Sequence, residues 1–103
     1  PIGAFYHHYI LKNFTHSAAL INLGGISNIS YINKKLFAFD LGPANLLIDD
    51  IMNHFFNKNY DKYGKNAFKG NSNNKKINLF KKDKFFKLKF PKSLDRNYFK
   101  KFR

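Results

Sequence analysis

The sequence predicts an α/β fold in which an antiparallel three-strand meander is followed by helices. Short apolar segments separated by turn residues occupy Ala18–Asp40, and strands this close together pair as a meander. Leu46–Phe56 then places apolar residues at helical spacing. From Asn57 the composition becomes polar and rich in lysine. The chain therefore divides into a meander with its first helix, 18–56, and a helical part rich in lysine and aromatic residues, 57–103.

Three segments are predicted as strands, and each is short and bounded by turn residues: Ser17–Leu23, Ile26–Ile32 and Leu36–Asp40. The first is a continuous apolar run, which is typical of a buried strand. Gly24-Gly25 is expected to turn the chain with positive φ and to allow close backbone approach. Gly42-Pro43 is expected to end the third strand, because proline cannot donate to the strand ladder.

Helices are predicted on both sides of the meander. Ala4–Lys12 has aromatic and aliphatic residues at helical spacing. Asn45 is expected to cap Leu46–Phe56, because its side chain can accept a hydrogen bond from the first free backbone N–H groups. Ser93 is expected to cap a last helix, Leu94–Phe102, in the same way.

Lys75–Phe90 interleaves lysines with apolar residues, and Asp83 interrupts its pattern. We favour two short helices packed on a neighbouring element. The alternatives are one basic amphipathic helix or an aromatic and lysine strip of the kind that binds single-stranded nucleic acid.

The charge is strongly basic, with 19 Lys and Arg against 6 acidic residues and a net charge of +13. Such a balance suits a nucleic acid or an anionic surface as a partner. However, 17 of the basic residues are lysine, only 2 are arginine, and Val, Trp, Gln and Glu are missing altogether. Proteins that read DNA bases favour arginine. We therefore expect compositional drift and no nucleic-acid partner, with a small basic binding module kept as the alternative function.

Several classes of site are excluded by composition. There is no cysteine, hence no disulfide, thiolate metal site or cysteine nucleophile. The four histidines lack the paired spacing of a zinc site. No apolar run approaches the ~20 residues that span a bilayer, and the first residues do not read as a signal peptide. We expect a cytoplasmic protein with no membrane partner.

Two loops rich in small residues predict a site for a phosphorylated ligand at one edge of the sheet. They are Leu23–Asn28 and Asp40–Asn45. Backbone N–H groups around Gly24 and Gly25 can approach a phosphate without a Cβ clash and form an anion-binding nest. Ser27 and Asn28 add side-chain donors. There is no Walker A lysine motif and no GxGxxG pattern.

The second loop contributes a carboxylate and a helix start. Asp40, beside Gly42, suits either water bound to Mg²⁺ or a substrate hydroxyl. Asn45 lies at a helix N-terminus, where an anion is favoured. Asp49 could take part in this site. Equally, it could serve only to place a negative charge near the positive end of the helix macrodipole.

At these residues the sequence resembles the anhydro-N-acetylmuramic acid kinases. LINLGGISNISYI is similar to their hairpin pattern N-I-G-G-I-A-N, and AFDLGPANLLIDD is similar to F-D-T-G-P-G-N-x-L-x-D. Tyr60-Asp61-Lys62-Tyr63-Gly64 resembles Y-D-x-x-G, and FPKSLDRNYF resembles P-P-K-S-T-G-R-E-x-F. Pro1–Leu11 resembles P-L-V-P-x-F-H. These five motifs follow one another along the chain in the same order as in the family, and together they cover nearly the whole chain.

The resemblance implies that 1–103 is a central fragment of a two-domain kinase, part of a ribonuclease-H-like domain of the sugar-kinase, actin and heat-shock-chaperone superfamily. It implies an ATP- and Mg²⁺-dependent enzyme that hydrolyses and phosphorylates 1,6-anhydro-N-acetylmuramic acid to N-acetylmuramic acid 6-phosphate in peptidoglycan recycling. The implied partner is this amino sugar. Apart from the resemblance, a homodimer and a complementing fragment are the two protein partners that we consider for the chain.

The resemblance also assigns site residues. The nucleotide-phosphate turn would comprise Gly24, Gly25, Ser27 and Asn28. A second cleft-lining loop would comprise Asp40, Gly42, Asn45 and Asp49.

The sequence departs from the family pattern at several positions. Leu41 replaces a threonine and removes a hydroxyl, Ala44 replaces a glycine, and Leu94-Asp95 replaces Thr-Gly. Alanine would be costly at position 44 if the backbone there needed positive φ. The family's catalytic aspartate falls upstream of Pro1 and its adenine-side glycine loop downstream of Arg103. We therefore expect no catalytic residue here and an inactive isolated chain, with an inactive remnant as a further alternative.

Overall fold

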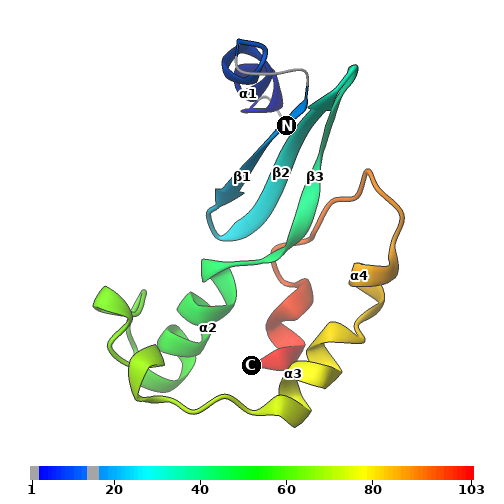
Figure 1. The fold of residues 1–103 in the computed structure, drawn as a ribbon. Coiled ribbons are helices and arrows are strands. Elements are labelled where there is room, and N and C mark those ends of the chain that lie inside the picture. The colour runs from blue at the N-terminus through cyan, green and yellow to red at the C-terminus, as the bar shows by residue number, and fades with distance from the viewer. Residues whose placement is uncertain (1–2, 14–16) are drawn as a thin grey trace.

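A computed structural model describes residues 3–13 and 17–103 (Figure 1). The elements occur in the order α1 (Gly3–Leu11), β1 (Ser17–Leu23), β2 (Ile26–Asn33), β3 (Lys35–Pro43), α2 (Asn45–Phe56), η1 (Lys62–Gly64), η2 (Ala67–Lys69), α3 (Asn74–Lys81), α4 (Lys84–Lys87) and η3 (Tyr98–Phe102). The meander, the helices on either side of it and the division of Lys75–Phe90 at Asp83 are confirmed.

The sheet is a three-stranded antiparallel meander in the order β1-β2-β3. Lys34 makes the second turn with a φ of 60°. The prediction that Gly42-Pro43 ends the third strand is wrong, because β3 continues to Pro43, which pairs with Ile26. A bulge between Ser27 and Asn28 shifts the register just before this last pair, and proline is tolerated at a strand end.

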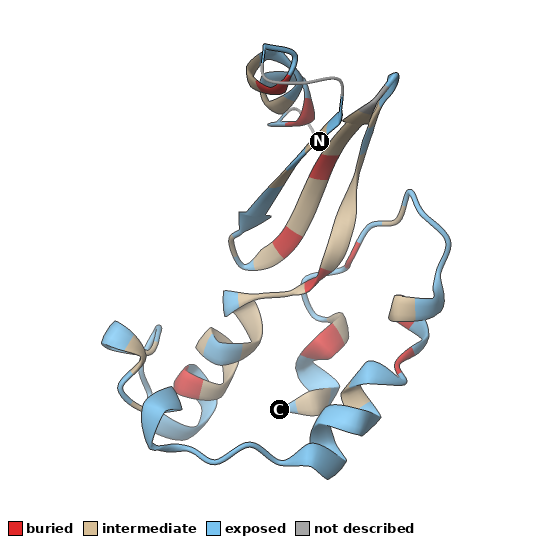
Figure 2. Ribbon diagram, viewed as in Figure 1, coloured by how far each residue is buried: buried red, intermediate tan, exposed pale blue. Residues whose placement is uncertain are grey.

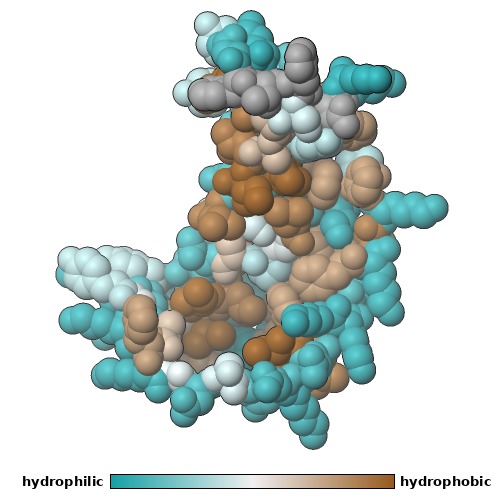
Figure 3. Space-filling view, in the orientation of Figure 1, coloured by the Kyte–Doolittle hydropathy of each residue, from teal (hydrophilic) through white to brown (hydrophobic). Residues whose placement is uncertain are grey.

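The first strand is not buried as its apolar run predicts. Within residues 3–13 and 17–103, β1 pairs with β2 alone, and Ile21 and Leu23 remain 55% and 69% exposed. Apolar side chains gather over the strands and α2, whereas hydrophilic ones line the outer rim (Figure 3). The apolar run predicts that the segment forms a strand, but it does not predict how many strands pair with it.

Helix α2 has nearly the predicted bounds, but its apolar stripe is only partly covered. Met52 is buried, while Ile48 and Phe55 are exposed. The helix ends at Phe56, and the C-cap Asn57 has a left-handed φ of 51°. The Asn57 N–H donates to the Asn53 carbonyl and the Lys58 N–H to the Met52 carbonyl, each at 3.2 Å.

An aromatic cluster forms the core of the C-terminal part. Phe85, Leu94 and Phe99 are buried, as Figure 2 shows for these segments, and several partly buried side chains pack on them: Ile26, Phe80, Phe86, Tyr98 and Phe102. These rings contact one another at centroid distances of 5.0–6.2 Å. Rings engaged in this way cannot stack on nucleic-acid bases, which weighs against the aromatic and lysine strip.

Asp83 joins α4 to the end of the chain. It is 9% exposed and accepts hydrogen bonds from the Phe85 N–H and the Tyr98 hydroxyl, each at 2.9 Å, and its other oxygen lies 2.6 Å from Lys101 Nζ. Burial acts to raise the pKa of Asp83, but the hydrogen bonds from Lys101, Phe85 and Tyr98 outweigh it and lower the pKa below its ordinary value. The hydrogen bond to Asp83 raises the pKa of Lys101.

The last helix begins four residues later than predicted, at Tyr98 and not at Leu94. η3 covers only Tyr98–Phe102, and neither Ser93 nor Asn97 caps it through a side chain. Leu94 is drawn instead to the sheet, where its N–H donates to Asp40. The C-terminal segment therefore lies between α2 and α3 (Figure 1). In the described part of the chain, no helix is long and apolar enough to cross a bilayer.

Candidate functional site at the glycine turn and the start of helix α2

The turn between β1 and β2 is fastened to the start of α2 by backbone hydrogen bonds. The Asn45 N–H donates to the Gly24 carbonyl at 3.1 Å, and the N–H groups of Ala44 and Leu46 donate to the Gly25 carbonyl at 3.0 Å. The turn carbonyls thus satisfy N–H groups at the helix start that would otherwise lack partners.

The prediction that Asn45 caps α2 is wrong. Ala44 is the N-cap and Asn45 is the first helical residue. The Asn45 side chain instead donates a long bond, 3.4 Å, to the Leu23 carbonyl. Ala44 has a φ of −122°, so the replacement of glycine by alanine carries no left-handed strain.

The glycine turn keeps its N–H groups free. Within the described residues, neither the Gly24 nor the Gly25 N–H donates to a protein acceptor, and Gly25 is exposed. The expected positive φ is wrong for both, since Gly64 is the only described glycine with one. A Cβ on Gly25 would meet Leu46 Cβ at an ordinary 3.7 Å. The turn therefore offers two adjacent N–H donors without a protein acceptor, although it lacks the left-handed residue of the αR-αL form of nest.

Ser27 and Gly42 join the two loops. The buried Ser27 hydroxyl donates to the Gly42 carbonyl at 2.9 Å, so it is committed to the fold and does not serve as the free donor that the sequence suggested. A Cβ on Gly42 would lie 3.2 Å from the Phe86 ring. A side chain here would require the Phe86 ring to shift by a few tenths of an ångström, because the ring packs directly against the backbone of the loop.

Asp40 fastens the C-terminal segment to the end of β3. Its N–H donates to the Lys92 carbonyl at 2.9 Å, and its carboxylate Oδ2 accepts from the Leu94 N–H at 2.8 Å. Lys92 Nζ donates to the Phe85 carbonyl and lies 4.5 Å from the centre of its ring. The sequence assigned no role to Lys92 or Leu94, and the separation of 54 residues between Asp40 and Leu94 hides their contact from any local pattern.

The predicted site residues thus separate into groups. Gly24, Gly25 and Asn45 meet at the junction of turn and helix. Asn28 pairs with Asp40 across adjacent strands, but it lines a different hollow of about 160 Å³ between α1 and the sheet. His7 also lines that hollow, and its Nδ1 lies 2.8 Å from Ser30 Oγ.

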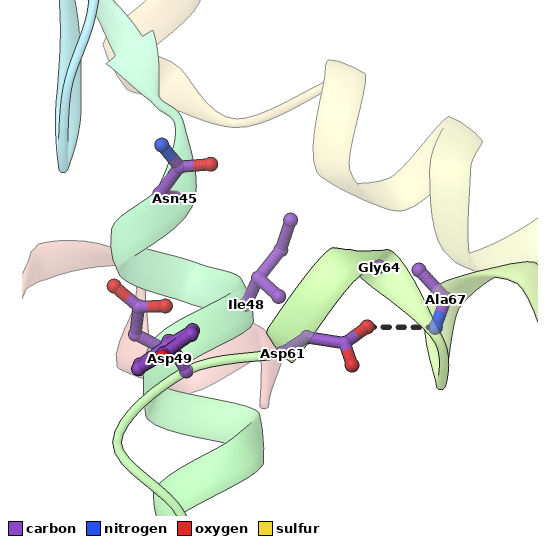
Figure 4. A pocket seen from close by; sticks show the side chains of 7 residues that line it. Asn45, Ile48, Asp49, Asp61, Gly64 and Ala67 are labelled. Carbon is purple, nitrogen blue, oxygen red and sulfur yellow. Dashed lines mark hydrogen bonds between the residues drawn. The ribbon is translucent and has the colours of Figure 1, made fainter.

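A second hollow, of about 380 Å³, lies beside α2 (Figure 4). Asn45 and Asp49 line it, together with Tyr60 and Asp61. Asp61 accepts hydrogen bonds from the N–H groups of Asn66 and Ala67 and from the Asn66 side chain, at 2.9–3.1 Å. The Ala67 N–H bond, followed by the Asn66 bonds, lowers the pKa of Asp61. Tyr60 and Asp61 belong to a quoted motif, yet the sequence reasoning assigned them no place in the site.

Among the described residues, no cluster of three or more histidine, cysteine or acidic side chains is arranged to hold a metal ion. One oxygen of the Asp40 carboxylate is already occupied, because it accepts from the Leu94 N–H.

Comparison with known proteins gives a consistent result. The family model described as anhydro-N-acetylmuramic acid kinase matches residues 1–102. The chain is 35% identical over 100 residues to the anhydro-N-acetylmuramic acid kinase of Hydrogenovibrio crunogenus, covering 96% of this chain and 27% of the relative. The proteins of the same name from Zymomonas mobilis and Bradyrhizobium diazoefficiens are 38% and 39% identical, again over 96% of this chain and 28% of theirs. The chain thus spans just over a quarter of the length of these relatives. It belongs to the anhydro-N-acetylmuramic acid kinase family.

Proposed function

We propose that this chain supplies the nucleotide-phosphate turn of a kinase that hydrolyses and phosphorylates 1,6-anhydro-N-acetylmuramic acid with ATP, within a ribonuclease-H-like domain of the sugar-kinase superfamily. The observation that carries the proposal is the pair of unpaired N–H groups at Gly24 and Gly25, on a turn whose carbonyls are bonded to α2. Family membership supports the choice of reaction.

The turn fits the phosphates of ATP. Phosphate oxygens accept hydrogen bonds from backbone N–H groups, and two adjacent donors without side chains can approach one phosphate group. The positive end of the α2 macrodipole lies beside the turn and adds a favourable field for negative charge. Bound ATP supplies the phosphoryl group, and the protein contributes positioning and charge stabilisation.

The residues fit Mg²⁺ in a supporting role. Mg²⁺ in such sites is held by one or two carboxylates together with phosphate oxygens and water. Asp40 Oδ1 has no protein partner in the described part of the chain, so it is available to a water bound to the ion. Bound Mg²⁺ would neutralise phosphate charge. We place no general base in this chain, so binding is the property to test.

The test is titration of Mg-ATP into the chain at physiological ionic strength or above, where exposed lysines attract nucleotide less. The variants are Gly25→Asp and its uncharged, isosteric control Gly25→Asn. Both are expected to fold, because position 25 has room for a Cβ and no left-handed φ.

We expect Mg-ATP at a hundred times its Kd to stabilise the wild-type chain by about 2.7 kcal/mol. Gly25→Asn should retain much of this stabilisation, and Gly25→Asp should lose it through repulsion between carboxylate and phosphate. Equal ATP binding by the two variants would refute the assignment.

A further inference from the structure

The hollow beside α2 differs in charge from the rest of this basic chain. Two carboxylates, Asp49 and Asp61, are among the residues that line it, and none of the lining residues is a lysine, arginine or histidine. The net charge of the chain is +13. Phosphate, which suits the glycine turn, does not suit this hollow, because the carboxylates would repel it.

Only one of the two carboxylates is available to a ligand. The Asp61 carboxylate points toward Ala67 (Figure 4). It accepts hydrogen bonds from three N–H donors, namely the backbone and side chain of Asn66 and the backbone of Ala67. Asp49 has no hydrogen bond or ion pair within the described part of the chain. A single free carboxylate is too few ligands for a cation site, since such ions take several oxygen ligands. It is, however, a strong acceptor for a hydroxyl group.

The other lining residues complement this acceptor. Asn45 lies one turn before Asp49 on the same side of α2, and among the described residues its amide group bonds to the Leu23 carbonyl alone, at 3.4 Å. Tyr60 and Ile48, both largely exposed, offer apolar surface. A carboxylate, an amide and an aromatic ring together match a sugar ring, whose hydroxyls both donate and accept and whose C–H face is apolar.

We propose that this hollow binds the hydroxyls of a sugar ring, with Asp49 accepting from a hydroxyl and Asn45 donating to an oxygen. The inference rests on the proposed function, because the hollow begins at the helical turn that the glycine loop contacts. Two sources share this chemistry there: the ribose of the nucleotide and the amino sugar. Ribose is the expected source, since a muramic acid carries a carboxylate that Asp49 would repel.

The test uses adenosine, which lacks phosphate, and 1,6-anhydro-N-acetylmuramic acid as probes. Each is titrated into the full chain while the amide resonances of Ala67 and the Asn45 side chain are followed by NMR. The variants are Asp49→Asn and Asp49→Ala. Asp50→Asn is the matched control, because Asp50 is the next residue on α2, bonds to Arg103 and does not line the hollow.

We expect adenosine to shift these resonances and Asp49→Ala to weaken its binding at least tenfold, with Asp49→Asn intermediate. Asp50→Asn should bind adenosine as the wild type does. Shifts caused by the anhydro sugar and lost in Asp49→Ala would support the hydroxyl site with the amino sugar as its source. Unchanged binding of both probes by Asp49→Ala, or no shifts in the wild type, would overturn the inference.

The outcome is independent of the phosphate turn. If Mg-ATP binding depends on Gly25 while adenosine does not bind through Asp49, the sugar site fails and the proposed function stands. If adenosine binds through Asp49 while Mg-ATP is indifferent to Gly25→Asp, the phosphate turn fails and the sugar site stands.

Discussion

Substitution of Asp40 by alanine should detach the C-terminal segment from the sheet. The Asp40 carboxylate accepts from the Leu94 N–H at 2.8 Å, and Leu94 is only 8% exposed. Removal of the Asp40 carboxylate would leave the Leu94 N–H without an acceptor at a position with little access to water. A lost hydrogen bond of this kind costs about 1–3 kcal/mol. Since 1 kcal/mol shifts the Tm of a domain of this size by about 4–8 °C, the midpoint value of 2 kcal/mol predicts a fall of roughly 8–16 °C.

The assay is urea denaturation combined with hydrogen exchange at the Leu94 amide. Asp40→Ala should speed exchange at Leu94 and lower the urea midpoint. Asp40→Asn keeps a side-chain oxygen and should lose less. Asp95→Ala is the control, because the Asp95 carboxylate accepts a local, exposed bond from the Asn97 N–H, and the bond from the Tyr98 N–H to the Asp95 backbone carbonyl is kept. Equal urea midpoints for Asp40→Ala and Asp95→Ala, with Leu94 exchange unchanged, would refute the reasoning.

Two further predictions concern the aromatic cluster. Because the pKa of Asp83 is lowered on folding, its contribution is present above the unfolded value of about 3.9 and should be lost as the pH falls through the folded pKa. The raised pKa of Lys101 means that its contribution is present below about pH 10.4 and is lost as the pH rises through the folded pKa. Urea midpoints should therefore fall more steeply below about pH 4 in the wild type than in Asp83→Asn, and identical slopes would contradict the prediction. Gly42→Ala should destabilise the chain by about 1–3 kcal/mol through overpacking against Phe86, as measured by thermal unfolding, and Phe86→Leu should offset part of this loss if the clash is its cause.

Local patterns in the sequence predicted most of the elements. The apolar runs around Gly24-Gly25 and the helical spacing after Asn45 depend on interactions within a few residues, and both were confirmed. The division at Asp83 was also confirmed, and the structure adds its reason, because the Asp83 side chain caps α4. The burial of β1 was predicted wrongly, because an apolar run does not reveal that a strand has a single neighbour.

The candidate site was predicted less well, because its geometry depends on contacts distant in sequence. The capping of α2 comes from carbonyls of the glycine turn and not from the Asn45 side chain. Ser27 is committed to the Gly42 carbonyl. Asp40 is committed in part to Leu94. The residue types suit phosphate chemistry, which stays a prediction, and only the fold shows which polar groups remain free.

The most direct test of the central claim is to follow the Gly24 and Gly25 amide resonances by NMR during titration with Mg-ATP. If the turn binds the nucleotide phosphates, these two resonances should show the largest shifts among the backbone amides, and AMP, with a single phosphate, should shift them less. The contradicting result is ATP binding that leaves both glycine amides unmoved and instead shifts the lysine-rich α3 and α4. Binding of that kind would assign the affinity to the net charge of +13 and not to a kinase site.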